Sequence, residues 1–261
     1  MVLENIDYHI YDACNLNCAS CNHFAPLVNE PNIITPAKAD KDFKLLYRLR
    51  DKFKKITILG GEALLNPHVG EIIALTRQYF TWPIKVKLIT NGTLKTELQK
   101  LKPIIENNHI ELVITEYPFI SNYREYYDKL KKEFPNATFY TFRHAHGFIS
   151  EHLAYNTVGT NEKVIWNCEK RYKCCQFVDG KLYICHYAAF LGNLRKITEF
   201  DFSNNDGYID LETCTNSQFD NFFSCYIPEI CHHCLFVRKK YEDLDKQDWH
   251  RSEKRPEEWI K

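Results

Sequence analysis

Short apolar runs recur through the first half of the chain, and each is followed by polar or turn-forming residues. Runs of this length that contain many Ile, Val, Leu and Thr residues are typical of buried β-strands. The pattern predicts strands near Ile6–Tyr11, Ile56–Leu59, Ile84–Thr90, Glu111–Thr115 and Thr138–Phe142.

The segments between these runs are longer and repeat apolar residues every three or four positions, which is the period of an amphipathic helix. Phe43, Leu46 and Leu49 show this spacing in the first segment. Strands that alternate with such helices form β-α-β units, so the pattern predicts an α/β fold with a parallel sheet. The predicted helices cover Pro36–Lys54, His68–Phe80, Leu94–Asn107 and Tyr123–Phe134.

The alternation fades after about Gly147, and eight of the eleven cysteines follow that point. Here Gln176–Cys185 is a predicted β-hairpin, because an Asp-Gly pair at 179–180 separates two runs of strand formers. The stretch from Asp243 to Glu258 is highly charged and predicts a solvated helix or a partly disordered end. We therefore divide the chain into a parallel-sheet unit (1–150), a cysteine-rich unit (151–240) and a charged C-terminal tail (241–261).

Charge and composition disfavour several classes of protein. The 261 residues include 34 basic and 34 acidic side chains, which gives no reason to expect nucleic acid or an anionic membrane as a partner. The first residues lack the pattern of a signal peptide, and the chain has no apolar run of about 18 residues that would cross a membrane. We expect a cytoplasmic protein, in which eleven cysteines indicate metal or cluster ligation rather than disulfides.

A tight cysteine triplet follows the first predicted strand: Cys14, Cys18 and Cys21, with the spacing C-x3-C-x2-C. Thiolates are the protein ligands of iron–sulfur clusters, and a cubane normally takes four of them. No fourth cysteine follows for nearly 150 residues, so the triplet suggests a four-iron cluster with one iron open to a small molecule. Three structural thiols, or a zinc site completed by His23, are the alternatives.

Two further motifs follow the second and third predicted strands, namely Gly60-Gly61-Glu62 and Thr90-Asn91-Gly92. The loops that follow the strands of a parallel barrel meet at one edge, where ligands bind. We therefore expect both motifs to lie on the same rim as the cysteine triplet.

Titratable residues follow the fourth and fifth predicted strands and should face the same rim. We regard them as candidates for substrate contact or proton removal, and a solvated loop is the alternative interpretation. These candidates are Glu116, Arg143, His144 and His146.

The triplet and the two later motifs together resemble the radical S-adenosylmethionine (radical SAM) superfamily. The resemblance implies a partial (β/α)6-type parallel barrel in which Cys14, Cys18 and Cys21 hold a [4Fe-4S] cluster and the methionine moiety of SAM completes the open iron. The Gly-Gly-Glu turn receives the methionine amino group in that family, where only glycine lets the backbone come close. The residues implied to bind SAM are Gly60, Gly61, Glu62, Thr90 and Asn91.

One position departs from the family pattern. The residue before the third cluster cysteine is usually aromatic in the family and packs near the adenine, whereas here it is Ser20. The resemblance leaves Phe24 or His23 to take over that contact, or the adenine to be held differently.

A second pattern occupies the cysteine-rich unit, where Cys168 is followed by Gly180 and Cys185, and Cys231 and Cys234 come later. It resembles the twitch domain, a shortened, SPASM-like extension with a β-hairpin and a helix around one auxiliary cluster. The resemblance implies a second [4Fe-4S] cluster on these four cysteines.

Two alternatives stay open for this second site. A structural zinc ion is compatible with the same four sulfurs. Either Cys174 or Cys175 also stands close enough in sequence to replace Cys168 as a ligand. Cys214 and Cys225 are interpreted as buried thiols.

The resemblance implies that SAM is cleaved to methionine and a 5′-deoxyadenosyl radical, which abstracts hydrogen from the substrate. The chain is similar in outline to small twitch-domain dehydrogenases of aminocyclitols. We therefore expect oxidation of a secondary alcohol on a sugar-like or aminocyclitol-like small molecule, with an electron donor such as flavodoxin or ferredoxin as partner. Epimerisation, peptide modification and a non-enzymatic zinc-binding interaction module are the alternatives.

Overall fold

Strands and helices alternate along the first half of the computed structural model, which describes residues 1–117, 120–141, 148–150, 153–157, 162–199, 207–237, 245–247 and 249–261. The strands are β1 (Ile6–His9), β2 (Lys55–Leu59), β3 (Lys85–Thr90), β4 (Glu111–Glu116) and β5 (Thr138–Thr141). The helices are α1 (Pro36–Tyr47), α2 (Val69–Tyr79), α3 (Lys95–Asn107) and α4 (Tyr123–Glu133). Each overlaps a predicted element.

The largest difference from prediction is the end of the first helix. α1 stops at Tyr47, and a short 3-10 turn (Arg50–Lys52) leads into β2. Leu49 and Phe53 are nevertheless buried, so the apolar spacing that extended the predicted helix reflects a connecting turn that packs on the core. The start was easier to predict, because the Thr35 side chain caps the helix and Pro36 suits its first turn.

The second half contains shorter elements. They are β6 (Phe148–Ser150), α5 (Glu162–Trp166), α6 (Lys170–Lys173), β7 (Cys175–Val178), β8 (Lys181–Tyr183), α7 (His186–Leu194), β9 (Tyr208–Asp210), α8 (Asn216–Cys225) and β10 (Asp245–Gln247). The predicted hairpin is confirmed as β7 and β8. Asp179 and Gly180 at its turn have φ values of 48° and 76°, the left-handed conformation that a tight two-residue turn requires.

One sheet of eight strands joins both halves, in the order β5-β4-β3-β2-β1-β7-β8-β9. The six strands from β5 to β7 are parallel, and β8 and β9 are antiparallel to their neighbours. This confirms the predicted α/β class with a mostly parallel, partial-barrel sheet. The sixth parallel strand is β7, which joins at the β1 edge, while β6 pairs with β10 outside this sheet.

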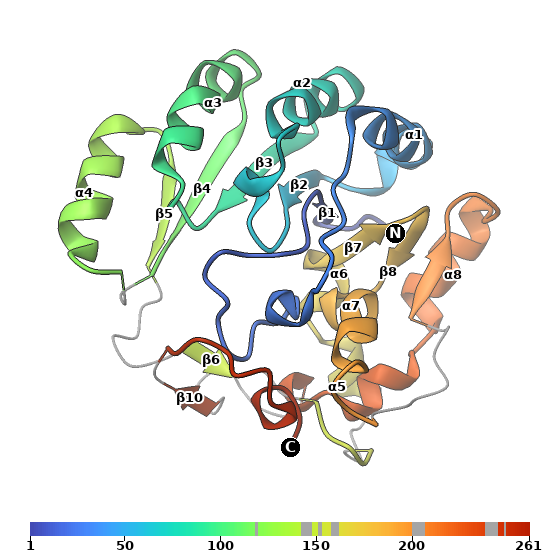
Figure 1. Ribbon diagram of the computed structural model, residues 1–261. Coiled ribbons are helices and arrows are strands. Elements are labelled where there is room, and N and C mark those ends of the chain that lie inside the picture. Colours follow the sequence, from blue (N-terminus) through green and yellow to red (C-terminus); the bar gives the residue numbers. More distant parts are fainter. Residues whose placement is uncertain are drawn as a thin grey trace.

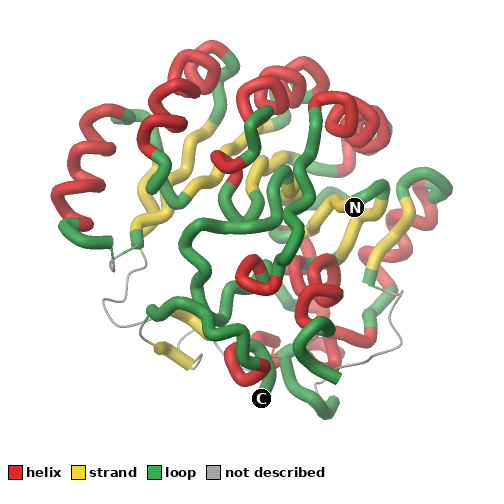
Figure 2. The backbone as a smooth tube through the Cα atoms, in the orientation of Figure 1, coloured by secondary structure: helices red, strands yellow, loops and turns green. Residues whose placement is uncertain are grey.

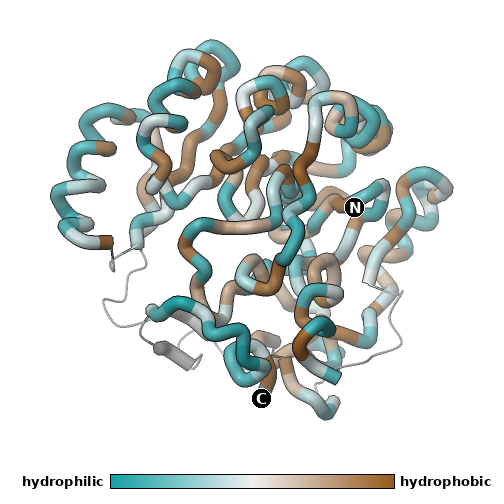
Figure 3. The backbone as a smooth tube through the Cα atoms, viewed as in Figure 1, coloured by the Kyte–Doolittle hydropathy of each residue, from teal (hydrophilic) through white to brown (hydrophobic). Residues whose placement is uncertain are grey.

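The two faces of the sheet are covered differently (Figure 1). Helices α1 to α4 lie together on one face, and the long loop after β1 and residues 249–261 lie on the other. That second side consists largely of loops and short helices (Figure 2). On the first side, hydrophobic strands, brown in Figure 3, lie behind helices whose outer turns are hydrophilic and coloured teal. Tyr8 faces the helical side, where its hydroxyl donates to Asp42 of α1, so His9 faces the loop side.

Two hydrophobic cores stabilise the fold. The larger core lies between the sheet and its helices and includes Phe177 and Leu182 of the hairpin and Phe219 of α8. The smaller core contains side chains that are far apart in the sequence: Phe24, Leu27, Leu153, Tyr187, Phe190, Leu191, Leu194, Ile230, Cys234, Trp259 and Ile260. The predicted sheet unit and cysteine-rich unit therefore share one sheet and one core.

Of the two alternatives predicted for the tail, a solvated helix or a partly disordered end, the helix is wrong for the residues that the structure describes there. Residues 249–261 contain no α-helix, and only a 3-10 turn at Pro256–Glu258 interrupts an extended path. Trp259 and Ile260 are 1% and 3% exposed. Charged side chains dominate the composition of the tail and, apart from the buried Glu258, are exposed in residues 249–261. Trp259 and Ile260 fix the tail to the smaller core. No helix of the described residues is long and apolar enough to span a membrane.

Phe177→Ala tests whether the hairpin belongs to the main core. Phe177 is 1% exposed and lies 6.0 Å from the Tyr8 ring, so the truncation should lower the free energy of unfolding by about 3–5 kcal/mol in one cooperative transition. Tyr140→Ala is the control, because that side chain is 63% exposed, and it should change the free energy of unfolding by less than about 0.5 kcal/mol. Two separate transitions, with the first half unaffected, would contradict the shared core.

Candidate cluster and cofactor site

The N-terminal cysteines line a cavity of about 300 Å³ at the carboxyl ends of β1 to β4. Its walls come from the loop after β1, the turn after β2, and the ends of β3 and β4. The rim predicted from the sequence is therefore a real concave site. It brings together the predicted residues Cys14, Cys18, Cys21, Gly60, Gly61, Glu62, Thr90 and Asn91.

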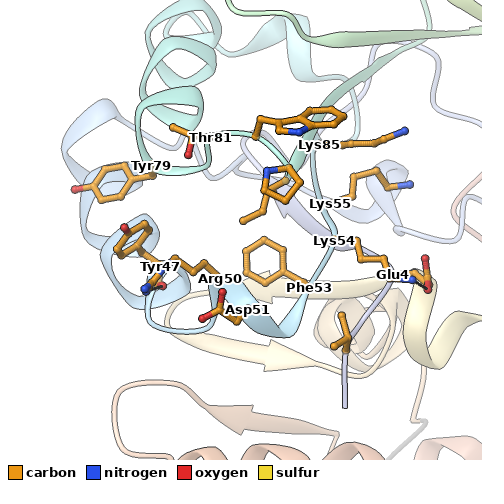
Figure 4. Close-up of a pocket in the computed structure, with 14 residues that line it drawn as sticks. Glu4, Tyr47, Arg50, Asp51, Phe53, Lys54, Lys55, Tyr79, Thr81 and Lys85 are labelled. Carbon is orange, nitrogen blue, oxygen red and sulfur yellow. Dashed lines mark hydrogen bonds and ion pairs between the residues drawn. The ribbon is translucent and has the colours of Figure 1, made fainter.

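A larger groove of about 820 Å³ lies elsewhere (Figure 4). Lys55 and Lys85, the first residues of β2 and β3, line it together with Tyr47 and Tyr79. It is thus at the amino ends of the parallel strands, opposite the cysteines, and no predicted site residue lines it. In parallel α/β folds ligands bind outside the carboxyl ends of the strands, so the smaller cavity is the candidate site.

The loop that carries the cysteines is shaped by left-handed residues. Asn17, Ser20 and Phe24 have φ values of 49°, 56° and 54°, which L-amino acids other than Asn and Asp seldom adopt. The backbone N–H of Phe24 donates to the carbonyl of Cys21 at 2.9 Å and closes the last turn. These reversals let three cysteines spaced over eight residues line one cavity.

Burial determines the acid–base state of these thiols. Loss of hydration raises the pKa of Cys14 to about 12 and also raises the pKa of Cys18 and Cys21. A bare thiolate is therefore unfavourable here, and a cationic iron cluster supplies the positive charge that would offset it. Three buried thiols that line one cavity, whose wall includes no Lys or Arg side chain, fit a cluster better than a reactive thiol site.

The two glycines of the turn after β2 have a structural role that the sequence did not predict. Gly61 N–H donates to the Tyr11 carbonyl at 2.8 Å, and Glu62 N–H donates to the Ala13 carbonyl at 3.0 Å. A Cβ at Gly60 would overlap the Tyr11 carbonyl, and one at Gly61 would lie 2.6 Å from the Asp12 carbonyl. The glycines are thus required so that the start of the cysteine loop can dock, in addition to any approach by a cofactor.

Glu62 lies at the centre of the wall and is 1% exposed. One carboxylate oxygen accepts from the Thr90 hydroxyl at 2.7 Å and from Leu64 N–H at 3.0 Å, and the other accepts from Asn91 N–H at 2.8 Å. Burial raises the pKa of Glu62, and these donors act in the opposite direction. The side chain is held in place and offers negative charge that suits a cationic amine.

Asn91 ties the third strand to the cysteine loop. Its amide donates to Asn15 Oδ1 at 2.9 Å and approaches Cys14 Sγ at 3.8 Å, and Asn15 donates to the Thr93 hydroxyl at 2.8 Å. Thr90 and Asn91 therefore orient neighbouring protein groups as well as lining the cavity, a role that a short turn motif does not reveal.

Other predicted residues lie away from the cavity or outside the described residues. Glu116 turns toward α4, where its carboxylate pairs with Lys131 at 2.6 Å, and it does not line the cavity. Phe24 is buried in the smaller core against Tyr187 and Trp259, so it is not placed to contact a nucleoside. Arg143, His144 and His146 lie outside the residues that the structure describes.

Tyr117 was not among the predicted site residues, but it lines the cavity together with Thr115. Alternation along β4 was the available signal, because residues 115 and 117 share a face from which Glu116 points away. His23 also lines the cavity, and its ring lies 4.6 Å from His9 and 5.4 Å from His186. Burial lowers the pKa of His9 to about 3 and that of His23 well below its ordinary value, so both imidazoles are neutral.

The later cysteines form a second group. A small pocket of about 30 Å³ is lined by Cys168, Cys185, Cys231 and Cys234 among apolar side chains, with Lys170 and Arg171 beside them. Cys175 is instead buried in β7, where its thiol donates to the Arg171 carbonyl at 3.1 Å, and neither Cys174 nor Cys175 lines the pocket. Within the described residues, no three His, Cys, Asp or Glu side chains are close enough to hold a single metal ion.

Comparison with known proteins agrees with this site. The profile of the radical SAM superfamily matches residues 8–163. An S-adenosylmethionine-dependent nucleotide dehydratase from Flammeovirga pacifica is 26% identical over 96 residues, which is 35% of this chain and 31% of that relative. The crystal structure of BtrN in complex with AdoMet and 2-DOIA has a TM-score of 0.55 at 16% identity, covering 86% of this chain and 83% of BtrN. BtrN in an open conformation gives 0.50 at 13% identity, covering 86% and 81%.

The matched region covers more than half of the chain. It includes the end of β1, the cysteine loop, β2 to β4 and both turns. The chain therefore belongs to the radical SAM superfamily, a class of enzymes. Membership implies one [4Fe-4S] cluster and SAM, and the cavity with its three thiols and Glu62 fits both. The likeness to BtrN shows the shared fold.

Gly61→Ala tests the docking of the cysteine loop. The added methyl group would meet the backbone at Asp12 and Ala13, so we expect the loop to shift and the variant to lose most of the iron bound near Cys14, with SAM binding weakened in parallel. Iron content after anaerobic reconstitution measures the effect. Gly192→Ala is the matched control, because nothing lies within 4 Å of its added Cβ. Normal iron content in Gly61→Ala would contradict the close approach.

Proposed function

We propose that this radical SAM enzyme oxidises a secondary alcohol of a sugar-like or aminocyclitol-like small molecule, with a second cluster as the electron acceptor. The main support is the second cysteine group, in which Cys168, Cys185, Cys231 and Cys234 line one pocket. Four thiolates leave a cluster no open iron, so such a cluster serves electron transfer.

The first cavity provides the groups that the cofactor needs. With SAM bound, the cluster chemistry would supply a carbon-centred radical that removes hydrogen from the substrate. Cys14, Cys18 and Cys21 would hold the cluster, and Glu62 is positioned to accept the cationic amine of SAM. His23 and Tyr117 line the same cavity beyond this wall. Arg143, His144 and His146 stay the candidates for taking the alcohol proton.

Two histidines in contact connect the segments that carry the two cysteine groups. His23 follows Cys21 by two residues, and His186 follows Cys185 directly. Their rings are 5.4 Å apart in an edge-to-face contact. This proximity supports passage of an electron from a substrate in the first cavity to a cluster in the second pocket.

Two similar proteins were considered as guides to the class of substrate. BtrN was crystallised with 2-DOIA, which supports a small cyclic substrate and leads us to use 2-DOIA as the first probe. The nucleotide dehydratase matches over only a third of its own length, and we do not transfer its activity. Epimerisation of a carbohydrate-type substrate is the second candidate, because the chain has further cysteines, such as Cys174, whose thiol would return a hydrogen atom to a substrate radical.

The number of clusters is the first test of the proposal. Anaerobically reconstituted protein should hold two four-iron clusters, and replacement of Cys14, Cys18 and Cys21 together by Ala should leave about half of the iron and abolish SAM cleavage. Iron, acid-labile sulfide and zinc analysis measures this. Cys214→Ala is the control, because this thiol lines neither pocket. Unchanged iron in the triple variant, or colourless protein with zinc, would refute the assignment.

Product mass separates oxidation from epimerisation. For 2-DOIA and related aminocyclitols, transfer of the second electron to a cluster would give a product lighter by about two mass units, with no deuterium gained in heavy water. Return of hydrogen from an exchangeable thiol would instead give a product heavier by about one unit in heavy water. We expect the loss, with one SAM consumed per turnover. A deuterated product of otherwise unchanged mass would establish the epimerase.

A further inference from the structure

Residues 249–261, which we call the strap, run along the loop that carries the N-terminal cysteines. Ala19 N–H donates to the His250 carbonyl at 3.0 Å, and Ser252 N–H donates to the Asn17 carbonyl at 2.8 Å. Cys18 and Arg251 form a β-bridge between these contacts. Main-chain pairing of this kind fixes the path of the loop on both sides of Cys18.

Two side-chain contacts continue the pairing toward Cys21. The Ser20 hydroxyl, 2% exposed, donates to the Glu258 carbonyl at 2.6 Å. The Trp259 indole N–H donates to the Cys21 carbonyl at 2.9 Å, and its ring packs on Phe24 at 6.1 Å. The position at which the sequence departs from the family pattern is thus explained, since Ser20 serves as a donor to the strap.

The strap also reaches the second cysteine group. Leu153 N–H donates to the Trp259 carbonyl at 2.9 Å, and Leu153 forms a β-bridge with Cys234 as well as with Ile260. Ala154 N–H donates to the His233 carbonyl at 2.8 Å. Trp259 therefore contacts Cys21 through its side chain and is one hydrogen bond away from the segment that pairs with Cys234.

We infer that the strap is an integral part of the SAM-cluster site: Ser20 and Trp259 are positioning residues that hold the cysteine loop in its cluster-binding shape and in register with the second cysteine group. This rests on the cluster assignment made above. Because the strap binds the ordered loop, cluster loading and strap docking stabilise each other by the same factor.

Variants at the two contacts test the inference. Ser20→Ala and Trp259→Phe each remove one hydrogen-bond donor with little change in shape, and Trp259→Ala also removes the packing on Phe24. We expect faster iron loss to a chelator in all three, most in Trp259→Ala, with selective loss of the electron paramagnetic resonance signal that shifts when SAM is added. Trp82→Ala is the matched control, since that side chain is 80% exposed and far from any contact used here.

A purely structural role would lower the melting temperature of the iron-free protein and leave iron loss unaffected in Ser20→Ala and Trp259→Phe. Iron-loss rates in these two variants equal to those of wild type and Trp82→Ala would overturn the inference. Wild-type protein that takes up no iron would instead overturn the cluster assignment itself, so the two failures are distinguishable.

Limited proteolysis tests the coupling without any substitution. Trypsin can cut the strap after Arg251 and Lys254, and mass spectrometry detects the released fragments. We expect release to be about tenfold slower from cluster-loaded protein than from iron-free protein, equivalent to about 1.4 kcal/mol of coupling. Equal release rates from the two forms would overturn the inference.

Discussion

The docking of the cysteine loop on the turn after β2 is the constraint on which the site depends. Two backbone hydrogen bonds join residues 61 and 62 to the carbonyls of Tyr11 and Ala13, at a separation that leaves no room for a Cβ. The same turn presents Glu62, whose oxygens bind the end of β3. Three strand ends are thereby fixed relative to one another before any cofactor is bound, which is the preorganisation that a buried cluster site needs.

Burial determines the protonation state of the side chains around the cavity. The thiols and imidazoles around the cavity are removed from water, which disfavours bare thiolates and imidazolium ions alike. Neutral His9 and His23 are compatible with a cluster and a cationic cofactor nearby, because they add no positive charge. A bound cluster would supply cationic iron that offsets the negative charge of the thiolates.

The smaller core links the two cysteine groups. Phe24 follows Cys21, Tyr187 follows Cys185, and Cys234 itself belongs to this core, as do Trp259 and Ile260. Packing in protein interiors is dense enough that such a core holds its elements at fixed distances. The electron transfer proposed above between the two groups would need such a fixed separation, which this packing provides.

Local patterns in the sequence determined the order of strands and helices in the first half, the hairpin turn at Asp179-Gly180 and the rim on which the motifs gather. Those features depend on periodicity of two or 3.6 residues and on turn chemistry, which short segments specify by themselves. The spacing of Cys14, Cys18 and Cys21 likewise identified the candidate cluster site, because three ligands on one loop are already close in sequence.

Only the tertiary structure decided which distant residues complete the site. It placed Cys168 rather than Cys174 or Cys175 with the later cysteines, turned Glu116 toward Lys131, and removed Phe24 into the core. It also placed residues 249–261, whose charged sequence predicts a solvated segment, against the cysteine loop. The burial of two side chains, Trp259 and Ile260, stabilises this position despite the charged residues around them. Such outcomes depend on burial against partners more than a hundred residues away, and the hydrophobic periodicity of a short segment cannot predict them.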